Sequence, residues 1–133
     1  MESLRLPAKL EHLESLISFA VQEAERMKLS EEEVFSVKLA LEELLVNSIS
    51  YAYPSGQGEI EIACFSADEG AFSVLVRDWG PPFNPLEMDE PDLSQGISEK
   101  RVGGLGIYLV RQMTKELTYR REGDANVLTL RFT

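Results

Sequence analysis

The stretch that decides the fold is residues 30–52, which read SEEEVFSVKLALEELLVNSISYA. Ser30 followed by Glu33 is a capping-box signature, so a helix is predicted to begin here and to run to about Ala52, where residues 54–56 (Pro-Ser-Gly) stop it. One stripe of this helix is apolar: Val34, Val37, Leu41, Leu44, Leu45 and Ile49. Other apolar residues, such as Phe35 and Val46, spread around the remaining faces. A helix that is apolar on most sides is predicted to be buried on most sides.

The elements on either side of this helix predict the layers of the fold. Residues 2–6 favour a short edge strand, and apolar residues at helical spacing favour a helix over residues 9–27. Two hairpins are predicted, one from residues 59–66 and 71–77 and one from residues 117–122 and 126–132. A third helix is predicted to open at Gly103 and to end near Lys115. This order predicts an α+β protein: a two-layer α/β sandwich whose mainly antiparallel sheet is covered by helices on one face.

Composition bounds the domain count and the function classes. A chain of 133 residues corresponds to one ordinary domain, so residues 1–133 are predicted to form a single unit. The formal net charge of −10 disfavours nucleic-acid phosphates and anionic membranes as direct partners. No apolar run approaches the roughly 20 residues of a membrane span. With a single cysteine, Cys64, and no export signal, the sequence predicts a protein of the reducing cytoplasm.

A carboxylate and an amide share one face of the predicted long helix. Glu43 and Asn47 are four residues apart and lie away from the main apolar stripe. Because Mg²⁺ prefers oxygen ligands and keeps several waters, one amide oxygen plus phosphates can hold it, with the carboxylate beside it as a general base. The same spacing also fits two solvated side chains. Glu42 is a second candidate base, although it lies about 100 degrees around the helix from Glu43.

Two further segments suit a nucleotide. Asp78 follows a predicted strand and precedes Gly80, so it can accept a hydrogen bond from an adenine amino group or merely cap a turn, while Gly80 would let a base approach the backbone. The run Gly103-Gly104-Leu105-Gly106 at a helix N-terminus is either a phosphate cradle or a flexible hinge.

The intervening segment is predicted to be a lid. Residues 84–102 form a long segment that contains prolines and lacks periodicity, and so long a loop in a compact domain is usually functional. Lys100 and Arg101, at its end, could reach a phosphate or could simply be solvated.

Taken together and in order, these segments resemble the motifs of the GHKL ATPase superfamily, which includes gyrase, heat-shock chaperones and histidine kinases. Residues 42–53 (EELLVNSISYAY) resemble its N-box, residues 78–83 (DWGPPF) its first glycine box, and residues 103–110 (GGLGIYLV) its second. The small size, the sequence PFNP at residues 82–85 and the closing NVLTL at residues 126–130 are similar to the anti-sigma-factor serine kinases. Tyr51 departs from the histidine that the superfamily often carries four residues after the N-box asparagine, and Pro82 replaces a glycine.

The resemblance implies a Bergerat fold and an ATP- and Mg²⁺-dependent serine/threonine kinase that phosphorylates a STAS-type anti-anti-sigma protein and binds a sigma factor. It implies that Glu43 is the base, that Asn47 binds magnesium, that Asp78 and Gly80 hold adenine, and that residues 103–106 (Gly103, Gly104, Leu105, Gly106) bind the phosphates of ATP or ADP. It also implies a homodimer. Two alternatives stay open: a nucleotide-gated binding module without kinase activity, and a detached histidine-kinase-type ATPase domain.

Overall fold

The computed structural model describes residues 2–53, 57–66, 70–87 and 102–133 of the chain, with residues 102–105 described in their backbone only. Strands and helices follow one another along the chain in the predicted order, and short 3₁₀ turns cover Leu10–His12 and Pro85–Glu87. The strands and helices are β1 (Glu2–Pro7), α1 (Leu13–Arg26), α2 (Glu31–Tyr51), β2 (Glu59–Ser66), β3 (Phe72–Asp78), α3 (Val102–Met113), β4 (Glu116–Glu122) and β5 (Ala125–Arg131).

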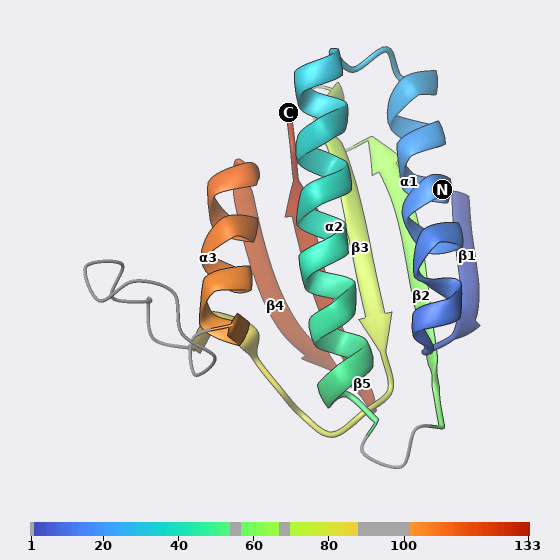
Figure 1. The fold of residues 1–133 in the computed structure, drawn as a ribbon, viewed down its shortest axis with the longest axis vertical. Coiled ribbons are helices and arrows are strands. Elements are labelled where there is room, and N and C mark those ends of the chain that lie inside the picture. The colour runs from blue at the N-terminus through green and yellow to red at the C-terminus, as the bar shows by residue number, and fades with distance from the viewer. Residues whose placement is uncertain (1, 54–56, 67–69, 88–101) are drawn as a thin grey trace.

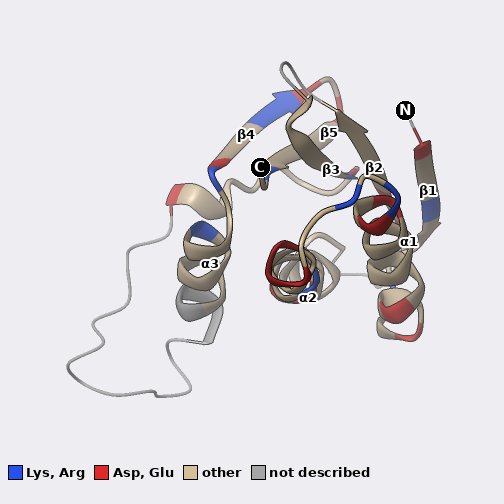
Figure 2. Cartoon of the chain, turned by 90° about the horizontal axis from the view of Figure 1, so that it is seen from above, with Lys and Arg blue, Asp and Glu red and all other residues tan. Residues whose placement is uncertain are grey.

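A five-stranded sheet forms one layer, with the strand order β1-β2-β3-β5-β4 and antiparallel pairing between all neighbours. The helices α1, α2 and α3 lie together on one face of it, with α2 between the other two (Figures 1 and 2). The predicted α+β sandwich is therefore confirmed. Strand β3 lies at the centre of the sheet, so its last residue, Asp78, is flanked by β2 and β5 at the end of the sheet.

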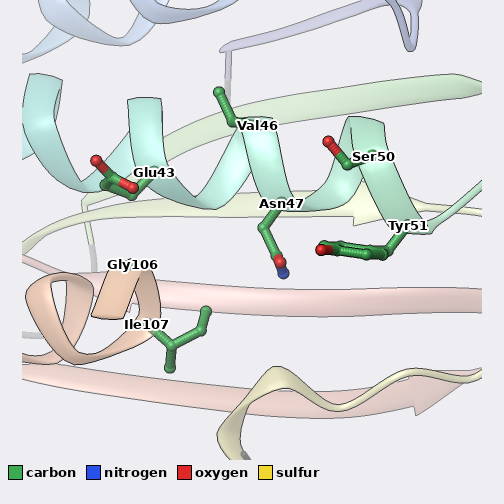
Figure 3. A pocket seen from close by; sticks show the side chains of 7 residues that line it. All are labelled: Glu43, Val46, Asn47, Ser50, Tyr51, Gly106 and Ile107. Carbon is green, nitrogen blue, oxygen red and sulfur yellow. The ribbon is translucent and has the colours of Figure 1, made fainter. Parts of the chain in front are cut away.

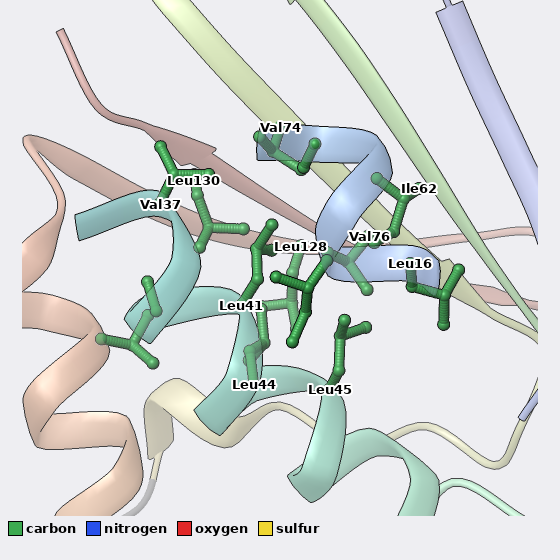
Figure 4. Packing of buried hydrophobic residues seen from close by; sticks show 14 of the residues in the cluster. Leu16, Val37, Leu41, Leu44, Leu45, Ile62, Val74, Val76, Leu128 and Leu130 are labelled. Carbon is green, nitrogen blue, oxygen red and sulfur yellow. The ribbon is translucent and has the colours of Figure 1, made fainter. Parts of the chain in front are cut away.

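Helix α2 is fixed at its start by the predicted capping box. The Ser30 hydroxyl accepts from the Glu33 amide at 3.1 Å, and the Glu33 carboxylate accepts from the Ser30 amide at 2.8 Å. Its inner face then packs on the apolar side of the sheet (Figure 4). The fully buried residues of this core include Val37, Leu41, Leu44 and Leu45 of α2 and Ile62, Val74, Val76 and Leu130 of the sheet.

The prediction that α2 is buried on most sides was wrong for its outer face. Phe35 is 59% exposed and Val46 is 37% exposed. The sheet covers one side of α2, and α1 and α3 flank it, which leaves its fourth side open to solvent (Figure 2). The apolar residues of α2 would allow most of its faces to be buried. In this two-layer fold, however, no second sheet or helix layer of the described residues covers the outer face of α2.

Several element boundaries also differ from the prediction. The first helix is divided into the 3₁₀ turn Leu10–His12 and α1, and Leu10, predicted to lie on the apolar face, is 63% exposed in that turn. Helix α3 begins at Val102 and ends at Met113, two residues before the expected end. The segment after Asp78, predicted to be irregular, contains the 3₁₀ turn Pro85–Glu87. Within the residues described, no helix is long and apolar enough to cross a bilayer.

Cys64 belongs to the core, and its burial affects stability at high pH. It is 5% exposed, and burial, with a smaller effect of the Glu23 carboxylate, raises the pKa of its thiol to about 12. A thiol whose pKa is higher in the folded state contributes stability that is complete below the pKa of the unfolded chain and is lost as the pH rises toward 12.

We therefore expect the free energy of unfolding to fall above about pH 9, by at most about 1.4 kcal/mol per pH unit. Cys64→Ala should show a flatter decline, because it has no thiol to ionise on unfolding. Urea denaturation of both proteins at neutral and alkaline pH measures this difference. Tyr53, whose pKa is also raised by burial, should leave a residual decline in the variant. Identical declines in the two proteins would contradict the expectation.

Candidate nucleotide-binding site

The residues predicted to act on phosphate lie where α2 faces α3. Glu43 and Asn47 are half-buried on α2 and line a hollow together with Val46, Ser50 and Tyr51 from the same helix and Gly106 and Ile107 from α3 (Figure 3). The side chain of Asn47 points down from α2, away from that of Val46, and Glu43 lies one turn earlier, over the start of α3 (Figure 3). The helical spacing therefore places the carboxylate and the amide on one wall, as predicted.

Asn47 carries an acceptor that has no partner within the described part of the chain. Its Oδ1 is buried and receives no hydrogen bond from any described residue. Such a buried oxygen costs roughly 1–3 kcal/mol unless something satisfies it, and a divalent cation is one such partner. In the described part of the chain, no three or more His, Cys, Asp or Glu side chains cluster as metal ligands. The residues present therefore fit a magnesium ion held by one amide oxygen, phosphates and waters.

Asp78 lies in a second hollow, which shares Asn47 and Tyr51 with the first. It is 6% exposed and forms the last residue of β3, rather than following the strand as predicted. Its Oδ1 accepts from the Gly80 amide at 3.0 Å and from Asn126 Nδ2 at 2.9 Å. Phe83 also lines this hollow and stacks on Tyr51, with ring centroids 6.4 Å apart. Asn47 and Tyr51 line both hollows, so they lie between Asp78 on one side and Glu43 on the other.

The backbone after Asp78 is fastened from two sides. The end of α2 holds one side, because the Tyr53 hydroxyl accepts from the Trp79 amide at 2.7 Å and donates to the Glu59 carbonyl at 2.6 Å. Arg121 of β4 holds the other side, through a donor to the Gly80 carbonyl at 2.8 Å. Burial raises the pKa of Tyr53, and the negative charge of Asp78 acts in the same direction, so Tyr53 stays a neutral hydroxyl.

Gly80 is glycine for a packing reason that the sequence did not reveal. A Cβ at this position would lie 2.1 Å from the Ala52 carbonyl oxygen, so the end of α2 leaves no room for a side chain. The group that closely approaches the Gly80 backbone in the structure is thus the Ala52 carbonyl. From the sequence, a nucleobase was expected there.

The second glycine run opens α3, as predicted. Gly103, Gly104 and Leu105 lie in its first turn, and their surroundings are outside what the structure describes, as are Lys100, Arg101 and most of the predicted lid. Gly106 is described and buried, and a Cβ there would lie 3.0 Å from Glu43 Oε2. Gly106 thus lies directly against the side chain of the candidate base, and a Cβ there would make Glu43 shift.

Three residues of this region were not identified as site residues from the sequence: Asn126, Tyr53 and Arg121. Asn126 is 3% exposed and pairs with Asp78 across β3 and β5. Its contact depends on strand register between segments 48 residues apart, for which no local pattern exists. A buried asparagine at the start of an otherwise apolar strand is the one signal that could have pointed to it.

An antiparallel sheet under α1, α2 and α3, with an asparagine-bearing central helix above the end of the middle strand, is the GHKL (Bergerat) ATPase fold. The chain belongs to the histidine kinase-like ATPase domain family, whose sequence profile matches residues 6–132. Among curated proteins, it is 24% identical to the serine-protein kinase RsbW of Bacillus thuringiensis strain Al Hakam and 26% identical to that of Bacillus anthracis strain A0248. Each match covers 97% of this chain and 82% of the relative.

Solved structures with the same fold include one from the SiaB–SiaC complex of Pseudomonas aeruginosa, with a TM-score of 0.69 and 16% identity over 98% of this chain and 88% of the other. A Mycobacterium tuberculosis protein with RsbU and RsbW domains matches with a TM-score of 0.62 and 12% identity. That match covers 98% of this chain but 32% of the other chain, so the present chain spans about a third of it. At these identities, the likeness shows the fold.

Proposed function

We propose that the protein is an ATP- and Mg²⁺-dependent serine/threonine kinase that acts in the cytoplasm as an anti-sigma factor. The observation that carries the proposal is the buried Oδ1 of Asn47, which no described residue satisfies; Asn47 lines both the hollow of Glu43 and the hollow of Asp78. The name of the RsbW relatives, serine-protein kinase, supports the reaction type. By resemblance to the anti-sigma kinases, the phosphate acceptor is a serine of a STAS-type anti-anti-sigma protein, the second partner is a sigma factor, and the active species is a homodimer.

Each residue of the site has one task in this proposal. Asp78 accepts a hydrogen bond from the adenine amino group, and Gly80 leaves the adjoining backbone free of a side chain. Asn47 Oδ1 holds magnesium, which when bound neutralises charge on the phosphates. The first turn of α3, residues 103–106, offers backbone N–H groups to the phosphates. Glu43, on the same wall as Asn47, removes the proton from the incoming serine hydroxyl. Phosphoryl transfer depends mostly on positioning and electrostatics, so this small set suffices.

The direct test is transfer of labelled phosphate from ATP to candidate partners, with the product residue identified by mass spectrometry. Phosphoserine on a STAS-type partner supports the proposal. Nucleotide-dependent binding of the partner without transfer would instead establish a binding module. Acid-labile phosphohistidine would establish a histidine-kinase-type ATPase domain.

Asn47→Ala should lose the Mg²⁺-dependent part of ATP binding and phosphate transfer together, because it removes the single protein oxygen proposed for the metal. Calorimetric titration of ATP with and without Mg²⁺ measures the first effect. We expect Mg²⁺ to tighten ATP binding to the wild type at least tenfold and to leave the variant nearly unaffected, in line with about 1.5–3 kcal/mol for an interaction with a charged group.

Two variants test the specificity of that result. Asn47→Asp keeps an oxygen at the same place and should retain a response to Mg²⁺. Gln112→Ala removes an amide from the exposed end of α3 and should behave as the wild type. A response to Mg²⁺ that survives in Asn47→Ala would show that Asn47 is not the ligand.

A further inference from the structure

The side chain of Asn126, which has no task in the proposed function, connects several segments around the site. It is 3% exposed, and Nδ2 donates to Asp78 Oδ1 and to the Pro81 carbonyl, both at 2.9 Å. Its Oδ1 accepts from the Phe83 amide at 3.2 Å and from the Tyr119 hydroxyl. One carboxamide on β5 thus joins the end of β3, the loop that follows it, and β4.

These partners fix which way the amide faces. Two donors, Phe83 N–H and Tyr119 O–H, meet Oδ1, while the acceptors Asp78 Oδ1 and the Pro81 carbonyl meet Nδ2. Turning the amide over would set donor against donor at Phe83 and acceptor against acceptor at Asp78 and Pro81, and the Tyr119 hydroxyl, which can donate or accept, fits either way. Only one orientation therefore satisfies all four contacts. Asn126 therefore always presents a donor to Asp78.

This fixed donor in turn fixes the Asp78 carboxylate. Oδ1 receives both the Asn126 amide and the Gly80 amide, and hydrogen bonds to an ionised group are the stronger kind. The carboxylate is therefore held through Oδ1 in one rotation, beside the hollow that Asp78 lines together with Asn47, Phe83 and Leu128. An ionised carboxylate held this way offers acceptors only, which suits a nucleobase that presents an amino group.

We propose that Asn126 is a positioning residue that acts through Asp78 to set the selectivity of the site for a nucleobase with an exocyclic amino group over one with a carbonyl at that place. The proposal rests on the proposed function, in which Asp78 binds adenine. A site built to pair with a donor discriminates strongly against an analogue that lacks it, provided that its acceptor cannot turn away. Without Asn126, the Gly80 amide is the one donor to Asp78 that remains among the described residues, so the carboxylate can rotate.

The test compares the affinities of ATP and inosine triphosphate, which has a carbonyl in place of the amino group. Asn126→Ala should weaken ATP about tenfold while inosine triphosphate changes little, so that the ratio of the two affinities falls about tenfold. Asn126→Asp has the same shape and replaces the donor by a carboxylate, so it should lower the ratio at least as far and serves as the test if the alanine variant does not fold.

A matched control separates positioning from stability. Tyr119→Phe removes one contact to the same amide but leaves the Asp78 contact in place, so it should lower the melting temperature without changing the ratio. In a protein that already carries Asp78→Asn, Asn126→Ala should change the ratio of the ATP and inosine triphosphate affinities less than about threefold. The reason is that the effects of two residues that act as a unit do not add.

Equal weakening of both nucleotides by Asn126→Ala, or the same loss of ratio in the Asp78→Asn background, would overturn the role of Asn126 and leave the proposed function standing. A wild-type protein that binds neither nucleotide would overturn the proposed function, and this inference with it.

Discussion

Glu43→Ala should slow phosphate transfer by about 10²- to 10⁴-fold, the usual contribution of a general base, while ATP still binds. Glu43 lies on the same wall of the hollow as Asn47, and its Oε2 lies against Gly106 at the start of α3, so it is aimed at the end of the site proposed for the terminal phosphate. A base directed at the acceptor hydroxyl contributes little to nucleotide binding. Removing a carboxylate near the phosphates should even tighten ATP slightly, because like charges repel.

Single-turnover transfer to the partner protein measures the rate, and calorimetry measures ATP binding. Glu43→Gln, which keeps the shape but cannot take a proton, should be nearly as slow as Glu43→Ala. Glu42→Ala is the matched control: Glu42 is exposed and lines a separate groove with Leu13 and Ile17 of α1, so its loss should leave transfer intact. Normal transfer by Glu43→Ala together with slow transfer by Glu42→Ala would show that Glu42, and not Glu43, is the general base.

Asp78→Asn should weaken ATP binding by about 10- to 100-fold, the equivalent of one hydrogen bond to a buried charged group. Both donors to Asp78, the Gly80 amide and Asn126 Nδ2, reach the same oxygen. An asparagine that keeps its oxygen toward these donors turns its own NH₂ toward the adenine amino group, and the opposite orientation opposes NH₂ to both donors. Neither orientation satisfies the site.

Calorimetry with ATP and ADP checks this prediction, and both nucleotides should weaken alike, because Asp78 is proposed to bind the base and not the phosphates. Asp124→Asn makes the same change of charge at an exposed position between β4 and β5 and should bind ATP normally. Unchanged affinity in Asp78→Asn would show that the nucleobase is bound elsewhere.

The order of elements and the candidate residues could be read from the sequence because their signals are local. The capping box of Ser30 and Glu33 sets the start of α2, and alternating residues set the strands within one residue or so of their observed ends. Glu43 and Asn47 share a wall because four residues make about one helical turn. These features depend on neighbours in the chain, so the sequence by itself determined them.

Tertiary structure alone decided which surfaces are covered and which distant residues meet. Phe35 and Val46 are apolar but exposed, because only one sheet and two flanking helices surround α2. Gly80 is required by the backbone carbonyl of Ala52, and Gly106 lies close to the carboxylate of Glu43. Both contacts join elements whose meeting no local sequence pattern encodes. Asn126 meets Asp78 because β5 pairs with β3 in one register, and a shift by one residue would turn Asn126 to the opposite face of the sheet. Register is set by the packing of the whole apolar face, and for that reason the residue that orients Asp78 became visible only in the folded chain.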